Sequence, residues 1–139
     1  MNTFKLDIEY DYEFLLVGVS CHEKDYRLSW AVNNKFGFEL KKSEDLEIKE
    51  KRKKEAAYYS LYLYEQKQEH REFYIIANRS KNNFLIPEQK QADYFIMVTG
   101  TISDQEKEFF IKSLKEINMV LVVFEIDPSQ LKSKENLLF

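Results

Sequence analysis

The chain has 139 residues, a length that fits one domain and is too short for two ordinary hydrophobic cores. Hydrophobic residues make up 44% of it, enough apolar surface to offset the entropy lost on folding, which argues against a disordered chain. The net charge of −3 excludes a general electrostatic attraction to nucleic acid or to an anionic membrane. We therefore expect a single domain over residues 1–139.

The cysteine content and the hydropathy pattern bear on location. Cys21 is the single cysteine, so an intramolecular disulfide is excluded. The sequence shows neither an apolar run of about 18 residues, as a membrane-spanning helix requires, nor a signal-peptide pattern. We expect a cytoplasmic protein without a membrane partner.

The first part of the chain predicts two strands and a helix. Alternation of apolar and charged residues predicts a short edge strand over Phe4–Tyr10, and the apolar run Phe14–Ser20 predicts a strand buried on both faces. A helix should follow directly. Ser20 and Glu23 have the spacing of a capping box, and Gly37 offers a left-handed residue at which the helix can end.

The middle of the chain predicts short antiparallel strands. Leu46 and Ile48 alternate with charged residues and predict a strand that leads into a solvated turn. Residues 56–65 and 72–77 predict a hairpin joined through the polar segment 66–71. The first of these strands should place Tyr58, Tyr62 and Tyr64 on one face of the sheet.

The last third predicts a strand over residues 94–100, a helix over 103–118 and a strand over 119–126. Ser103 and Glu106 form a second capping-box pattern at the start of that helix. The strand 119–126 is almost uniformly apolar, which predicts a central strand flanked on both faces. Together these elements predict an α+β fold, with one twisted, largely antiparallel sheet of five or six strands and two main helices on one face.

The segment "IPEQKQADY", residues 86–94, is the most distinctive short stretch. Pro87 disfavours the helical conformation for Ile86, and Glu88 suits the first turn of a short helix. Asp93 precedes an apolar strand, where its carboxylate can accept backbone N–H groups or pair with a cation such as Arg79. Lys81 is a second cation within reach of the same loop. We interpret the segment as a structural joint; the alternative is a Glu88/Asp93 carboxylate pair that performs acid/base chemistry or binds a hard cation.

This segment resembles the signature of the IPExxxVDY proteins, small proteins of Bacteroidota. The matching positions are Ile86, Pro87, Glu88, Asp93 and Tyr94, and Ala92 stands where the signature has valine. The upstream stretch from residue 17 to residue 33 is also similar to the way these proteins begin. The family has no established activity, so the resemblance implies no mechanism.

Cys21 and His22 raise the question of a thiol nucleophile. A cysteine in the first turn of a helix meets partial positive charge, which can lower its pKa and make it reactive. Neighbouring residues on a helix point in different directions, however, and the other histidine, His70, lies in a predicted turn. A packed, unreactive thiol is therefore the favoured interpretation. One cysteine and two scattered histidines give no metal-ligand spacing, so we predict neither a metal site nor a cofactor.

A basic run followed by aromatics raises a third alternative. Residues 49–64 combine "KEKRKKE" with "YYSLYLY", and single-stranded nucleic acid needs cations for its phosphates and aromatic rings for its bases. Glu50 and Glu55 interrupt the charge, so a solvated turn beside a sheet face is the favoured interpretation. Nucleic acid is accordingly not the expected partner.

These signals favour a non-catalytic cytoplasmic domain that binds a protein partner or a second copy of itself. The candidate contact surfaces are the face with Tyr58, Tyr62 and Tyr64, the loop with Glu88 and Asp93 together with Arg79, and Trp30 with its neighbouring aromatic Tyr26. The first alternative is a small enzyme centred on Glu88 and Asp93 or on Cys21. The second is a weak single-stranded nucleic-acid binder that acts through residues 49–64.

Overall fold

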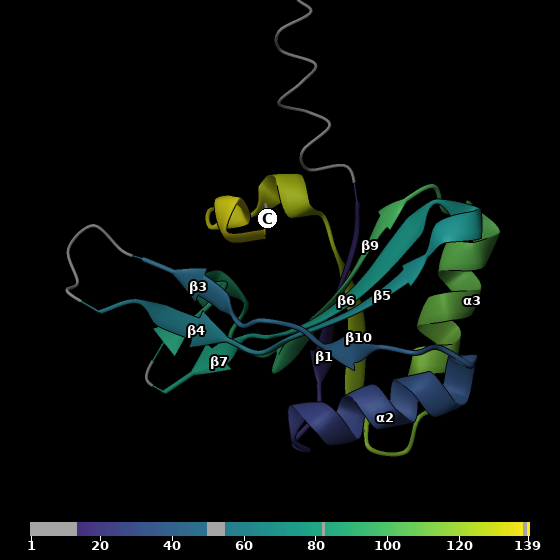
Figure 1. Ribbon diagram of the computed structural model, residues 1–139, viewed down its shortest axis with the longest axis horizontal. Helices are drawn as coiled ribbons and strands as arrows, with labels where there is room; N and C mark the ends of the chain where they lie inside the picture. Colours follow the sequence, from purple (N-terminus) through teal and green to yellow (C-terminus); the bar gives the residue numbers. More distant parts are fainter. Residues whose placement is uncertain (1–13, 50–54, 82, 138) are drawn as a thin grey trace, which may run out of the picture.

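A computed structural model describes residues 14–49, 55–81, 83–137 and 139 (Figure 1). The strand expected over Phe4–Tyr10 and most of the basic run, residues 50–54, lie outside the described residues. Within the described part, six strands form one antiparallel sheet in the order β10-β1-β9-β6-β5-β2. Their bounds are β1 Leu15–Ser20, β2 Lys41–Lys42, β5 Leu61–Gln66, β6 Arg71–Ala77, β9 Tyr94–Gly100 and β10 Val122–Ile126.

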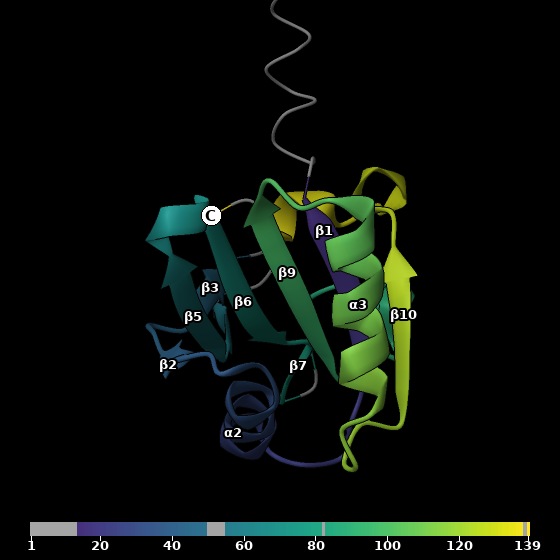
Figure 2. The same ribbon diagram turned by 90° about the vertical axis from the view of Figure 1, so that its right-hand side faces the viewer.

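Two α-helices of the described chain, α2 (Asp25–Phe36) and α3 (Asp104–Lys115), pack on one face of this sheet (Figures 1 and 2). Helix α2 follows β1, and α3 follows β9. Because neighbouring strands are antiparallel, β1 runs parallel to β6 with β9 between them, and β9 runs parallel to β10 with β1 between them. This is the split β-α-β arrangement of ferredoxin-like folds, here extended by β5 and β2. The predicted fold class is confirmed.

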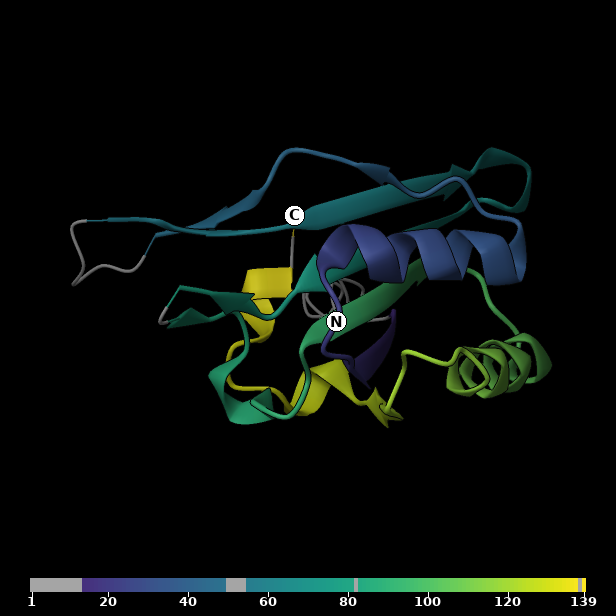
Figure 3. The same ribbon diagram turned by 90° about the horizontal axis from the view of Figure 1, so that it is seen from below.

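The other face of the sheet is covered by short elements. Two hairpins, β3 (Leu46–Ile48) with β4 (Ala57–Tyr59) and β7 (Arg79–Ser80) with β8 (Asn83–Phe84), extend to one side of the sheet (Figure 3). The 3-10 helices η1 Lys67–Glu69, η2 Pro87–Gln89, η3 Pro128–Gln130 and η4 Lys134–Leu137 complete the described elements. The last two belong to the C-terminal tail, whose Leu131 and Leu137 are buried on this face, so the tail covers the core.

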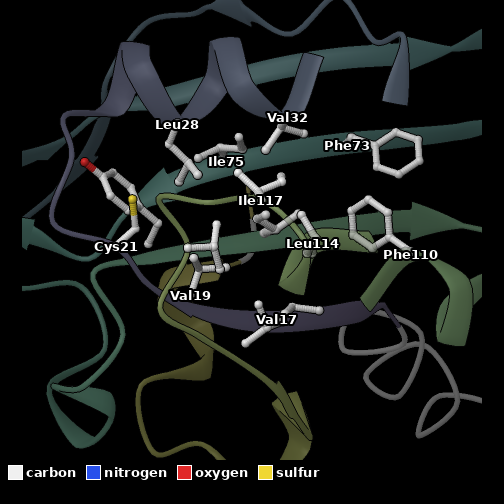
Figure 4. Packing of buried hydrophobic residues seen from close by; sticks show 14 of the residues in the cluster. Val17, Val19, Cys21, Leu28, Val32, Phe73, Ile75, Phe110, Leu114 and Ile117 are labelled. Carbon is white, nitrogen blue, oxygen red and sulfur yellow. The ribbon is translucent and has the colours of Figure 1, made fainter. Parts of the chain in front are cut away.

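The core consequently lies in two layers. On the helix side, Leu28 of α2 and Leu114 of α3 meet Val17, Val19 and Ile75 from the strands (Figure 4). On the loop side, a second buried cluster includes Leu16, Ile76, Leu85, Ile86, Phe95 and Leu137. Successive strand residues point to opposite faces, and this explains why the apolar run of β1 supplies both layers.

Local signals predicted several elements correctly. Helix α3 has the predicted capping box, in which the Ser103 side chain accepts from the backbone N–H of Glu106 and the Glu106 carboxylate accepts from the backbone N–H of Ser103. Gly37 ends α2 in the left-handed conformation, with φ of 71°. The β5–β6 hairpin and the short strand β3 also form where predicted.

The predicted capping box at Ser20 and Glu23 is wrong. Ser20 is the last residue of β1, and its carbonyl accepts from the backbone N–H of Leu121. Helix α2 begins at Asp25, with Lys24 as an N-cap residue that makes no side-chain cap hydrogen bond. Cys21 therefore precedes the helix by a full turn and does not lie in its first turn.

The predictions for residues 56–65 and 119–126 also need correction. The first segment is two strands, β4 and β5, interrupted at Ser60, whose hydroxyl donates to the Asp25 carboxylate on α2. The second contains β10, which forms an edge of the sheet, so it is not a central strand. Leu121 and Val122 at its start are 58% and 52% exposed. The apolar run therefore includes exposed residues at the edge of the sheet and does not mark a central strand.

Candidate functional site

The segment 86–94 is held in place by a buried asparagine that precedes it. Asn78 has no exposed surface, and its side-chain amide donates to the carbonyl oxygens of Gln89 and Ala92 at 2.9 Å each. Its side-chain oxygen accepts from the backbone N–H of Ile86 at 2.8 Å. All three bonds go to the backbone of one loop, so Asn78 fixes the shape of that loop.

Asp93 and Tyr94, at the end of the segment, clamp the connection between β1 and α2. Asp93 Oδ2 accepts from the backbone N–H of Cys21 at 2.9 Å, and Oδ1 accepts from Arg79 Nε at 3.0 Å. The Tyr94 hydroxyl donates to the carbonyl oxygen of Glu23 at 2.6 Å. These bonds account for the delayed start of α2, because they hold residues 21–23 in a non-helical path.

Glu88 has a different partner from Asp93. Its two carboxylate oxygens accept from the backbone N–H and from the hydroxyl of Ser133, at 2.8 and 3.0 Å. Burial raises the pKa of Glu88, but the hydrogen bonds from Ser133 outweigh it and hold the pKa below its usual value. Glu88 thus fastens the C-terminal tail, whereas Asp93 fastens the β1–α2 connection. The two carboxylates do not converge on one site.

The Cys21 thiol is 1% exposed and free, and burial raises its pKa above the usual value. A raised pKa reduces the thiolate fraction, which a nucleophile requires. His22 lies exposed at the surface beside it. Cys21 therefore lacks the environment of an activated thiol. Within the described residues, no group of three His, Cys, Asp or Glu side chains is placed to hold a metal ion.

The predicted tyrosine face is mostly covered. Tyr62 and Tyr64 lie on the helix side, half-buried against the core, and Tyr64 is close to the rings of Phe38 and Phe73. Tyr58 lies in the separate β4 strand and is 54% exposed. The three tyrosines therefore do not form one open surface, because the interruption at Ser60 separates the first from the other two.

An exposed apolar surface lies beside α2 and the start of β10. Trp30 on α2 is 65% exposed and lines a shallow hollow with Ile117 and Met119, which belong to the α3–β10 connection. Leu121 and Val122 follow directly at the start of β10. We call this set, with the backbone of β10, the β10 surface. In Figure 2, β10 lies at one margin of the sheet, with α3 on the near side.

Sequence reasoning found Trp30 but missed the rest of the β10 surface, and it also missed Asn78 and Ser133. The exposure of Leu121 and Val122 could not be read from an apolar run. No signal in the sequence distinguishes Asn78 from an ordinary turn asparagine, since its partners lie 8 to 14 residues away.

Comparison with known proteins gives no further guidance on this arrangement. No family model, no curated protein and no solved structure matches the chain. None of the helices in the described part of the chain is long and apolar enough to cross a membrane.

Proposed function

We propose that this protein is a non-catalytic interaction domain that associates with a second copy of itself through the β10 surface. The observation that carries the proposal is the pair Leu121 and Val122, both more than half exposed. Val122 is the first residue of β10, an edge strand among the described residues, and Leu121 directly precedes it. Successive strand residues point to opposite faces, so these two side chains flank the same stretch of edge backbone. An added strand would cover both of them and would pair with the side of β10 on which no strand of the described residues lies.

The residues along β10 favour a second copy as that added strand. Two copies of β10 can pair antiparallel about a two-fold axis, which gives an isologous contact. With Phe124 on the axis, Val122 lies opposite Ile126 of the second copy, and Glu125 lies opposite Val123. No two glutamates face each other in this register. Glu125 is also paired with Lys107 at 3.3 Å within its own chain, so each copy brings a balanced charge to the contact.

Trp30 extends the proposed contact beyond the strand. Large aromatic side chains contribute contact area at low entropic cost, and exposed tryptophan is enriched where proteins bind each other. Trp30 and Tyr26 lie four residues apart on α2, at 65% and 58% exposure, and therefore share one side of the helix. The aromatic pair supports a contact that is wider than one strand.

The two alternatives receive less support. The enzyme alternative requires a pocket centred on Glu88 and Asp93 or on Cys21, whereas the two carboxylates have separate partners and the thiol is buried. The nucleic-acid alternative requires a row of exposed aromatics, and Tyr62 and Tyr64 are half-buried. We further propose a cytoplasmic location, which the free cysteine favours, and membership of the IPExxxVDY proteins on the residues matched above.

Static light scattering tests the proposed function. The chain should show a mass approaching twice 16.8 kDa as its concentration rises from about 5 to about 500 μM. Val122→Lys should stay monomeric, because it places a charge beside the edge. Tyr58→Lys is the matched control: Tyr58 is similarly exposed at 54% and lies in a different hairpin, so this variant should dimerise like the original chain.

Two results would overturn the proposal. One is a single mass of 16.8 kDa at every concentration. The other is a dimer that Val122→Lys and Tyr58→Lys weaken equally. Both substitutions are at exposed positions, and a thermal unfolding curve of each variant would verify that it remains folded.

A further inference from the structure

A second hollow lies at the end of the molecule away from the β10 surface, between the end of α2, the start of α3 and the β5–β6 turn. Its volume is about 360 Å³, and its walls are largely aromatic. Phe36 and Phe110 lie with ring centroids 4.9 Å apart, and Phe38 packs on Phe36 at 5.2 Å. Phe109, which also lines the hollow, is 68% exposed. The apolar walls suit a flat, apolar ring.

Two polar side chains enter this aromatic hollow from the sheet. Gln66 and Arg71 are directly opposite each other at the ends of β5 and β6, so their side chains share a face. The side-chain oxygen Oε1 of Gln66 and the Nε of Arg71 are both buried, and neither has a hydrogen-bond partner among the described residues. Buried polar atoms are almost always paired in folded proteins, and each unpaired one costs about 1–3 kcal/mol.

The charge at this end of the hollow is balanced. Arg71 Nη1 donates to Glu106 Oε2 at 3.0 Å, and the Arg71 side chain is only 14% exposed. The bond from Arg71, together with those from Ser103 at the helix cap, lowers the pKa of Glu106 to about 2. Glu106 is therefore ionised at neutral pH and compensates the guanidinium. An additional anion would disturb this balance, so the hollow favours a neutral ligand.

We propose that this hollow binds a small planar cyclic amide, whose ring lies against the phenylalanines. Gln66 Oε1 and Arg71 Nε have almost no accessible surface in the free protein, so binding turns both side chains toward the hollow, where the carbonyl of the amide accepts from Arg71 Nε and its N–H donates to Gln66 Oε1. A cyclic amide carries an acceptor and a donor side by side, which matches the adjacent donor and acceptor of the protein. The site is independent of the proposed dimer, because none of its residues belongs to the β10 surface.

Three probes test this assignment. 2-Pyridone has the required ring, acceptor and donor; 1-methyl-2-pyridone lacks the donor; benzoate has the ring but carries a negative charge. Followed by amide chemical shifts, 2-pyridone should bind with a dissociation constant on the order of 1 mM or tighter, and the other two at least about tenfold more weakly. The shifted signals should include residues 66, 71 and 109.

Variants separate binding at this hollow from non-specific association. Gln66→Leu should weaken 2-pyridone at least about tenfold, since it removes the acceptor. Gln105→Leu makes the same change at an exposed lining residue and should leave binding unchanged. Equal binding of all three probes, or equal effects of the two variants, would overturn the proposal. The proposal would also be overturned if none of the three probes bound.

Discussion

The loop 86–94 and the β10 surface differ in whether their side chains are already engaged within the chain. In the loop, the polar groups are engaged within the chain: Asn78 holds its backbone, Asp93 holds the β1–α2 connection, and Glu88 holds the tail. At the β10 surface, apolar side chains are exposed beside an edge strand. The distinctive motif thus makes its polar contacts within the chain, whereas the proposed contact lies at the edge of the sheet.

This difference predicts that changes in the loop alter stability and leave association intact, while changes in β10 do the reverse. The largest effect on stability should come from Asn78→Ala. It leaves the Ala92 carbonyl oxygen and the Ile86 N–H buried without partners and removes one of the two hydrogen bonds to the Gln89 carbonyl oxygen, so it should lower the free energy of unfolding by roughly 3–5 kcal/mol.

Urea unfolding of Asn78→Ala, followed by far-ultraviolet circular dichroism, measures this loss. Asn83→Ala, at a half-buried position in β8, provides a control for the loss of an asparagine near the same loop. A loss below about 1 kcal/mol for Asn78→Ala would contradict the role of this residue as the centre of the joint.

A smaller effect is expected for Asp93→Asn. The amide keeps one oxygen, so either the Cys21 N–H or Arg79 Nε loses its acceptor, and the charge opposite Arg79 disappears. The side chain is 15% exposed, and the expected loss is about 1–3 kcal/mol. A double-mutant cycle with Arg79→Gln should show a coupling of about 1 kcal/mol. Simple additivity of the two losses would contradict the proposed pairing.

The smallest effect is expected for Glu88→Gln, and it should depend on pH. Because the pKa of Glu88 is lowered in the folded state, its ionised form stabilises the protein above the unfolded pKa, and that contribution is lost as pH falls through the folded pKa. The original chain should exceed Glu88→Gln by about 1 kcal/mol near pH 7, a value discounted for the exposure of the side chain.

Urea titrations of both proteins at several pH values test the sign of this effect. Below about pH 4, the difference in unfolding free energy should shrink toward zero. A difference that stays constant, or that grows in acid, would contradict the hydrogen bonds from Ser133.

The sequence allowed the helix side of the fold to be predicted better than the loop side. Helix α3, its Ser103 capping box and the β5–β6 hairpin depend on residues close together in the chain, so periodicity and spacing indicate them. The bond between Glu88 and Ser133 spans 45 residues, which no local pattern can indicate.

The same reason explains the wrong start of α2. Ser20 and Glu23 satisfy the local capping pattern, but Asp93 and Tyr94, some 70 residues away, hold residues 21–23 outside the helix. Similarly, the apolar run at β10 gave no sign that the strand lies at an edge, because hydropathy records burial preference and not strand order.

Hydrogen exchange of backbone amides at low and high protein concentration tests the central claim most directly. If two copies pair through β10, the amides of residues 122–126 that face away from β1 should exchange more slowly at high concentration, while those of residues 85–94 should not change. Concentration-independent exchange along β10, in a sample whose mass shows a dimer, would contradict the claim and place the contact elsewhere.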